Sequence, residues 1–512
     1  MFLKFFNNNR SNILLLIALL VYNSLFFSER FGLNILLFLL LVFSFQYLLF
    51  KESFKSRNVL ISVALTVFTA VMLVWHNSLL SKWMFFISYA ITLGFIIQPG
   101  LRFIGYSLLT SISNFVKFPV ELLTWEKSSS KAAKRGLKFS KVWLVSIFPI
   151  LIGVVFFMIY RISNPIFAEV TDTFWKEIGI KISELLKHIS VLRMLFVLLG
   201  LFLLSGMLIH RNYSLFAHEE ALLADSITRK RSKPWSAYFS IAFKNEYWSG
   251  LILLIIMNLM LLVLNTIDIK YLWINFEIPK GLSLSELVHQ GTEWLIVSVF
   301  LSMIVVIYLF RANQNFYSKS KWLKILAIAW MLQNMVLTIS LWIRNNNYIS
   351  WHALAYKRLG VYVFIALTIF GLITMLIKIH HSKSLFYLLR MNAWAAYLVL
   401  CGVCIVNWDI YIAKYNVEFK SGAQLDTDFL LKLSPKAYPY IFENIDRVEQ
   451  LIKAHELNVE NIPYTYYNFQ QFKYELTRLS QIYIAGNSET TWRSYSVADD
   501  CALQYLKDKI KE

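Results

Sequence analysis

Residues 247–266 read YWSGLILLIIMNLMLLVLNT, a run without one charged side chain. About twenty predominantly apolar residues make an α-helix long enough to cross the hydrocarbon core of a bilayer. Lipid offers the backbone no hydrogen-bond partners, and a helix satisfies its own N–H and C=O groups internally. This stretch therefore predicts a transmembrane helix and decides the fold class.

Similar apolar runs lie on both sides of this stretch. We predict an all-α, polytopic bundle of about eleven transmembrane helices. The spans are Ile13–Phe27, Leu33–Phe50, Val59–Trp75, Trp83–Ile97, Val142–Tyr160, Val191–Ile209, Tyr247–Thr266, Trp294–Phe310, Ile325–Trp342, Gly360–Ile379 and Ala393–Val406. The first run follows Lys4 and Arg10 as in a signal peptide, but no small-residue cleavage site follows it, so we expect it to be retained.

The composition agrees with a membrane protein. Of 512 residues, 57% are hydrophobic and only 16% are charged, whereas soluble domains carry about a quarter charged residues. The net charge of +19 does not indicate nucleic-acid binding, because the basic residues flank the apolar runs instead of forming one soluble basic face. Membrane lipids are the partners that this pattern predicts.

The distribution of Lys and Arg predicts the orientation. With a cytoplasmic N-terminus, the inner connections hold more than twice as many basic residues as the outer ones. The densest block runs from Lys127 to Lys141. Because cytoplasmic loops collect positive charge, we expect the N-terminus inside and, after an odd number of crossings, the C-terminus outside.

Two domains are expected from the change in composition near residue 407. Residues 1–406 form the transmembrane helical domain, with an inner-surface segment at 98–141 and an outer amphipathic segment at 161–190. Residues 407–512 contain no spanning run, and their apolar residues recur at helical spacing. We predict that they form a soluble, extracytoplasmic helical domain.

The predicted spans hold polar residues but essentially no charged ones, which argues against a proton-coupled or ion-coupled carrier. Asn258 and Asn265 lie seven residues apart, on one helix face, and Asn334 and Thr338 share another face. These four residues either line a polar cavity or hydrogen-bond neighbouring helices, and the second interpretation is favoured.

The densest polar cluster lies in the predicted outer loop between the ninth and tenth spans. It contains Arg344, Tyr348, Tyr356, Lys357 and Arg358. Three cations outside the membrane run against the positive-inside trend, and Arg suits phosphate or carboxylate. We predict an anion-binding or partner-binding site, for a lipid phosphate, an anionic glycan or an acidic patch of the C-terminal domain.

The chain leaves the last span through NWDIYIAKYN at residues 407–416. Asn407, Asp409, Tyr415 and Asn416 can hydrogen-bond outer loops once the apolar run ends. We predict that these residues join the soluble domain to the bundle.

This motif resembles the pattern N-x-D-x-x-I-A-x-Y-N of a bacterial multi-pass membrane family, which is known as a domain of unknown function. The stretch that begins at Asp426 and the sequence Trp492-Arg493-Ser494 also resemble that family, although Phe429 and Lys436 depart from its Tyr and Asp. The resemblance extends from about the fifth span to the C-terminus. It implies a location in the bacterial cell (inner) membrane and no particular activity.

Standard catalytic and metal-binding motifs do not occur in the sequence, and we predict no catalytic residue, metal or cofactor. The favoured hypothesis is a scaffold, sensor or regulator of the cell envelope. Its outer helical domain would engage an envelope protein or a lipid-linked molecule. The alternative is a lipid-linked enzyme or lipid transporter with an outward-facing phosphate site. Glu29 in the first outer loop, and Glu169 and Asp172 in the third, are the acids that such an enzyme could use, although the first loop is short for such a site.

Overall fold

The computed structural model describes residues 9–124, 149, 152–153, 156–185, 190–209, 215–228, 237–274, 284–311, 313–317, 320–418, 425–456, 467–488 and 490–511. Helices are the regular elements of these ranges, and no strand occurs among them. The predicted all-α class is therefore confirmed.

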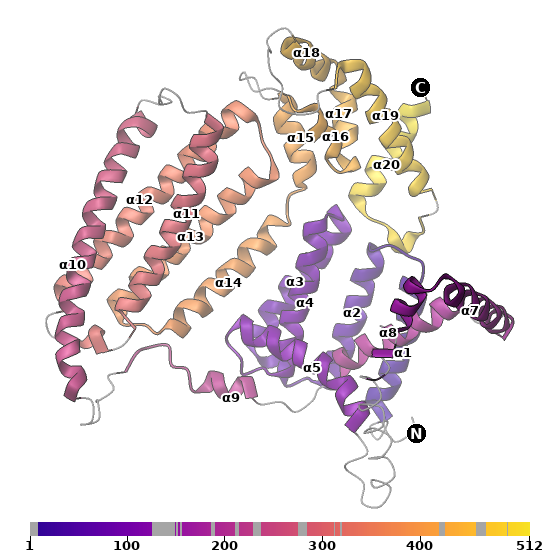
Figure 1. Cartoon of the computed structure of the whole chain (residues 1–512), viewed down its shortest axis with the longest axis horizontal. Coiled ribbons are helices and arrows are strands. Elements are labelled where there is room, and N and C mark those ends of the chain that lie inside the picture. Colours follow the sequence, from indigo (N-terminus) through magenta and orange to yellow (C-terminus); the bar gives the residue numbers. More distant parts are fainter. Residues whose placement is uncertain are drawn as a thin grey trace, which may run out of the picture.

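Two groups of helices lie side by side (Figure 1). The first comprises α1 (Asn9–Phe26), α2 (Leu33–Leu49), α3 (Arg57–His76), α4 (Leu79–Ile97), α5 (Ile104–Thr124) and α8 (Val191–Leu208). The second comprises α10 (Ala237–Asp268) with a π-helical turn (Ile269–Ile274), α11 (Leu284–Leu309), α12 (Lys321–His352), α13 (Tyr356–His381) and α14 (Leu385–Val403). Helix α14 joins the groups, because Cys401 packs in the first core and Leu388 in the second.

The C-terminal helices gather at one end of both groups, at the top of Figure 1. They are α15 (Trp408–Glu418), α16 (Thr427–Lys432), α17 (Tyr438–Glu443), α18 (Ile445–Glu456), α19 (Phe469–Gly486) and α20 (Val497–Lys511), with 3₁₀ turns η7 (Pro435–Ala437) and η8 (Trp492–Ser494). Their buried core includes Phe472 and Leu506, and it also includes Ile349 of α12 and Leu354 of the following loop. These C-terminal helices, which we refer to as the C-terminal domain, therefore share their core with the membrane part.

Seven helices among the described residues are long and apolar enough to cross a membrane, namely α3, α4, α8, α10 with its π turn, α12, α13 and α14. Three shorter apolar helices, Arg10–Phe26, Leu33–Leu49 and Trp294–Leu309, correspond to the first, second and eighth predicted spans. Most of the fifth predicted span, Val142–Tyr160, lies outside the described residues. The total of eleven therefore remains a prediction.

The connections between these helices lie on two faces. We call the side that contacts the C-terminal helices the domain face; it contains residues 28–32, 76–78 and 353–355. The opposite face contains residues 51–56, 98–103 and 382–384, together with α9 (Leu215–Ala221) and the 3₁₀ turns η2 (Ser53–Lys55) and η6 (Asn313–Phe316). Of the connections named here, those predicted to be outer lie on the domain face, and those predicted to be inner lie on the opposite face.

The chain changes faces between α4 and α8. Helix α4 ends on the opposite face, where Pro99 accepts a hydrogen bond from Ser56. Helix α8 begins near the domain face, because Arg193 Nε lies 3.3 Å from Asn23 Oδ1 near the end of α1. This change of face fits one further crossing between them, as the fifth predicted span requires.

Both predicted non-spanning segments contain helices. Within 98–141, α5 buries Ser107 and Asn114 against the bundle and exposes Leu109, Ile112 and Val116. Residues 125–141 of this segment lie outside the described residues. Within 161–190, α7 (Pro165–Leu185) extends to the side of the first group in Figure 1.

Helices α4 and α5 meet through a glycine. A Cβ atom on Gly94 would lie 1.9 Å from the backbone oxygen of Ser107, and Ser107 Oγ also donates to Ile91 O at 2.5 Å. A backbone atom cannot yield as a side-chain end can, so only glycine permits this contact.

We predict that Gly94→Ala lowers the free energy of unfolding by about 1–3 kcal/mol through overpacking. Gly360→Ala is the matched control, because Gly360 lies in α13 and has nothing within 4 Å of a built Cβ atom. Thermal unfolding of both variants in lipid nanodiscs measures the difference. Equal midpoints for the two variants would show that α4 and α5 do not pack this closely.

Candidate functional site

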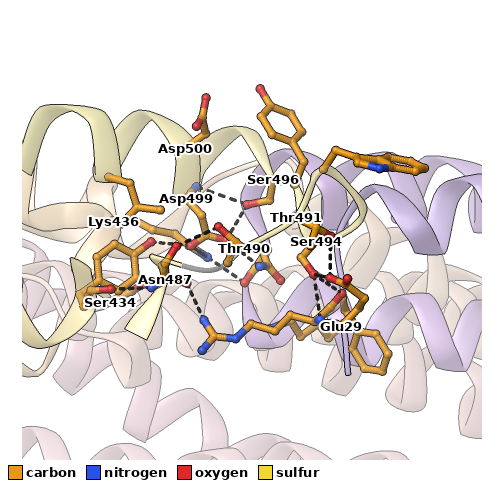
Figure 2. A pocket seen from close by; sticks show the side chains of 18 residues that line it. Glu29, Ser434, Lys436, Asn487, Thr490, Thr491, Ser494, Ser496, Asp499 and Asp500 are labelled. Atoms are coloured by element: carbon orange, nitrogen blue, oxygen red, sulfur yellow. Dashed lines mark hydrogen bonds and ion pairs between the residues drawn. The ribbon is translucent and has the colours of Figure 1, made fainter. Parts of the chain in front are cut away.

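A cavity of about 570 Å³ lies between the C-terminal domain and the ends of α1–α4 on the domain face. Figure 2 shows that its polar side chains come from sequence segments far apart in the chain. Its lining includes Glu29, Arg30, Asn77, Lys82, Lys436, Tyr483, Asn487, Ser494, Ser496, Asp499 and Asp500. This interdomain cavity is the most polar site on the domain face that we describe.

Asp499 is the centre of the interdomain hydrogen-bond network. Its Oδ2 accepts from Asn77 Nδ2 of the α3–α4 connection and from Ser496 Oγ, both at 2.6 Å. Its Oδ1 accepts from the Tyr483 hydroxyl at 2.8 Å and lies 3.4 Å from Lys436 Nζ. The Asp499 amide in turn donates to Ser496 Oγ, as at a capped helix start. Asp499 lies in the first turn of α20, where the helix dipole favours negative charge.

The environment of Asp499 shifts its pKa. Burial by itself would raise the pKa, but Lys436 and the hydrogen bonds from Ser496, Asn77 and Tyr483 outweigh burial and lower it. For the Lys436 ammonium group, burial lowers the pKa, and the nearby Asp499 carboxylate opposes that shift. Both side chains are thus held as a partly buried ion pair within one network.

Two cations cap helices across the domain boundary. Lys436 of the C-terminal domain donates to His76 O at 2.7 Å and to Asn77 O at 2.8 Å, at the C-terminal end of α3. In the other direction, Arg30 of the α1–α2 connection donates to Gly486 O at 2.8 Å, at the end of α19. Helix C-termini leave carbonyl groups without intrahelical partners and carry partial negative charge, so each cation satisfies the other domain's helix.

The α1–α2 connection makes further close contacts with η8. Glu29 Oε2 accepts from Thr491 Oγ1 at 2.8 Å and from Ser494 Oγ at 2.7 Å. A Cβ atom on Gly32 would lie 2.6 Å from backbone atoms of Ser494 and Tyr495. Glu29 is therefore bound in the docking contact, and Gly32 permits the approach of the two backbones.

A second contact joins the C-terminal domain to the α12–α13 hairpin. Asn416 Oδ1 accepts from the Leu354 amide at 2.7 Å, and Asn416 Nδ2 donates to Leu354 O at 3.0 Å. Asp409 accepts from the Tyr356 hydroxyl and, at 2.9 Å, from the Ser434 amide. The structure thus brings two of the four predicted junction residues directly against the hairpin.

The other two junction residues occupy less central positions. Asn407 lies at the start of α15, where its side-chain oxygen is 3.5 Å from the Ile410 amide. Tyr415 packs at the edge of the C-terminal core.

The structure does not assemble the predicted anion-binding cluster into one site. Arg344 pairs with Asp268 at 2.6 Å, and both side chains are at least 90% buried. The Arg358 guanidinium donates to His352 O and Ala353 O at the end of α12 and lies 4.6 Å from the centre of the Tyr348 ring. Lys357 is exposed. The two arginines therefore bind groups of this chain instead of presenting free forks to an external phosphate.

The buried polar residues hydrogen-bond helices. Asn258 Nδ2 donates to Leu326 O of α12 at 3.0 Å, and Asn265 Nδ2 donates to Gln333 O at 3.0 Å. Asn334 and Thr338 each bond a carbonyl one turn earlier in α12. The contacts of Asn258 and Asn265 fit the interpretation that these residues bond a neighbouring helix, whereas Asn334 and Thr338 bond their own helix. None of the four lines the interdomain cavity.

The expectation that the predicted spans hold essentially no charged residues has an exception near the end of the tenth span. Lys378 in α13 is 1% exposed and donates to Phe310 O at 3.0 Å. Asp268, two residues beyond the seventh predicted span, is buried with Arg344. Each charge has a partner on another helix, which is how charged groups are retained in such surroundings.

Sequence reasoning missed the importance of Asp499. Its local signal was Ser496-x-x-Asp499, a capping pattern that marks a helix start but does not reveal partners in the α3–α4 connection. Within the described residues, no group of three or more His, Cys, Asp or Glu side chains is placed to hold a metal ion.

We predict that Asp499→Asn weakens docking of the C-terminal domain by about 2–3 kcal/mol, because it leaves Lys436 buried without its counter-ion. Asp500→Asn is the matched control, since it makes the same charge change one residue away, where Asp500 accepts from Gln504 at 3.1 Å. Protease protection of the C-terminal domain in full-length protein measures the effect. Equal protection of both variants would contradict a central role for Asp499.

The lowered pKa of Asp499 also predicts a pH dependence. A carboxyl whose pKa is lower in the docked state adds stability above its free pKa of about 4, and that stability is lost as the pH falls through the lower value. The thermal midpoint of the wild type should therefore exceed that of Asp499→Asn by a constant amount above about pH 5. The gap should narrow below about pH 4. A gap that widens in acid would mean that the sign of the shift is wrong.

Comparison with known proteins gives one match. The family profile described as a domain of unknown function, DUF4153, matches residues 35–444. The match begins in the second predicted span, whereas the motifs indicated that the resemblance starts at about the fifth span. It ends before Trp492-Arg493-Ser494. No curated protein and no solved structure is similar enough to give a match. Because the profile covers well over half of the chain, this protein is a multi-pass membrane member of the DUF4153 family.

Proposed function

We propose that this protein is a non-enzymatic scaffold, sensor or regulator of the bacterial cell envelope, in which reversible docking of the C-terminal domain on the membrane helices is the regulated event. The observation that carries the proposal is the pair of reciprocal helix caps, Lys436 on α3 and Arg30 on α19. Both capping cations line the interdomain cavity, so the contact between the two parts is not a continuous apolar interface here.

The character of the interface favours reversible docking. Interdomain contacts that are polar and limited in area allow relative motion of the domains. Around the cavity the contacts are ion pairs and hydrogen bonds, with Asp499 and Glu29 as the main acceptors. At the hairpin, by contrast, Ile349 and Leu354 belong to the apolar core of the domain. The hairpin contact therefore acts as the hinge side and the cavity contact as the side that opens.

The proposed orientation has the N-terminus in the cytoplasm and the C-terminal domain outside the inner membrane. It is supported by the excess of Lys and Arg in the connections that the sequence predicts to be inner. Membrane lipids surround the bundle, whose outward surface is apolar, as at Leu259 and Val263 of α10. An envelope protein or lipid-linked molecule would then be the partner of the exposed C-terminal domain.

The alternative function, a lipid-linked enzyme or lipid transporter with an outer phosphate site, has less support. Arg344 and Arg358 are already bound to Asp268 and to the α12 carbonyls. Glu29, one of the acids considered for such an enzyme, accepts from Thr491, Arg493 and Ser494. Lys357 alone among the three loop cations is left exposed.

The proposal predicts that contacts of the C-terminal domain in cells depend on docking. A photo-crosslinking amino acid at Tyr474, which is 67% exposed on α19, should yield defined products in full-length protein. Gly32→Val, which blocks the approach to η8, should change their yield at least about threefold. Gly100→Val is the control, because nothing lies within 4 Å of a Cβ atom there.

Product yields read from gels of crosslinked membranes decide the outcome. The same products in the same yield from the wild type, Gly32→Val and Gly100→Val would contradict regulation through docking. Absence of any product at position 474 would count against an interaction role for the domain.

A further inference from the structure

A second cavity, of about 700 Å³, lies on the domain face between the α12–α13 hairpin and the start of α15. Its walls come from the last turns of α12, the first turns of α13 and the segment where the chain leaves α14. Its volume falls within the range of small-ligand sites in proteins. It is separate from the interdomain cavity around Asp499, and the two share no lining residue.

The lining of this cavity contains no charged side chain. It consists of Asn346, Asn347, Ile349, Ser350, Leu354, Leu359, Tyr362, Val406, Trp408, Tyr411 and Tyr415. Four of these eleven residues are aromatic, and two are amides. A site without charge does not favour an anionic head group or a metal ion, because neither would find a counter-charge to offset its desolvation.

The aromatic rings are held in place by the chain itself. Trp408 Nε1 donates to Val403 O at 2.9 Å, and the Trp408 and Tyr411 rings meet edge to face at 5.8 Å between centroids. Tyr362 donates its hydroxyl to Asn346 Oδ1 at 2.5 Å. Rigid rings of this kind present both apolar faces and polar edges to a ligand.

Hydrogen-bonding groups remain available in the cavity. Within the described part of the chain, no hydrogen bond engages the Asn347 amide or the Tyr411 hydroxyl, and Tyr411 is 47% exposed. An amide offers donors and an acceptor side by side, which matches a pair of neighbouring hydroxyl groups. A ligand that carries hydroxyl groups around its edge and apolar C–H groups on its face would match both the polar groups and the aromatic rings of the lining.

We propose that this cavity binds a neutral saccharide unit. The apolar face of a pyranose ring stacks on Tyr411 and Trp408, and its hydroxyl groups bond the Asn346 and Asn347 amides. The proposal is independent of reversible docking, because its residues lie on the hairpin side and not among the contacts of Asp499. The sugar would come either from a free glycan or from the head group of a glycolipid, since the cavity lies where α14 ends.

The test uses full-length protein in phosphatidylcholine nanodiscs prepared without sugar detergents. One arm adds maltose and chitobiose and records saturation-transfer NMR from the protein to the sugar protons. The other arm dopes the nanodiscs with glucosyl diacylglycerol and counts retained lipids by native mass spectrometry. Binding in the first arm supports the site and assigns a free glycan, whereas binding in the second arm alone supports it and assigns a lipid head group.

Variants of Tyr411 supply the specificity control. Loss of the ring in Tyr411→Ala should weaken binding about threefold to tenfold, the range expected for one aromatic contact. Tyr411→Phe keeps the ring and should weaken binding less than Tyr411→Ala does. Tyr474→Ala removes an exposed tyrosine of α19 outside the cavity and should change nothing. No sugar signal and no glycolipid preference in folded protein, or an equal loss in Tyr474→Ala, would overturn the proposal.

Discussion

The exposed carbonyl groups at helix C-termini are the constraint on which the arrangement depends. A helix that ends at a membrane face leaves its last carbonyls without intrahelical partners. In this protein cations supplied from elsewhere in the chain satisfy them. Lys436 serves α3, Arg30 serves α19, and Arg358 serves α12. Two of these caps cross the domain boundary. The hydrogen bonds that satisfy the last carbonyls of α3 and α19 are therefore the same bonds that dock the C-terminal domain.

This constraint explains why the C-terminal domain spans both helix groups. The caps at α3 and α19 attach it to the first group, and the Asn416 contacts with Leu354 attach it to the hairpin of the second. Its core includes Ile349 of α12. Residues 407–512 are thus a distinct unit in composition, but their packing is completed by the membrane part.

The apolar runs predicted the membrane helices well because burial in lipid is a local property of twenty residues. The hydrogen-bonding role favoured for Asn258 and Asn265 also followed from local spacing. The partners of the charged residues did not follow from local spacing. Arg358 carries the same chemistry whether its acceptor is a phosphate or a helix carbonyl, and sequence spacing does not distinguish them. Asp268 with Arg344, and Asp499 with Asn77, are separated by tens to hundreds of residues, so their pairing exists only in the folded chain.

The most direct test of this account is the proximity of the α1–α2 connection and η8 in the native membrane, where the Leu33 amide donates to Tyr495 O at 3.0 Å. Cysteines at Phe31 and Tyr495, which line the same cavity and leave both capping cations in place, can be joined by a short bis-maleimide in a Cys501→Ser background that removes the exposed native thiol. The account predicts an intramolecular cross-link in full-length protein. Free modification of each cysteine without any cross-link would contradict it.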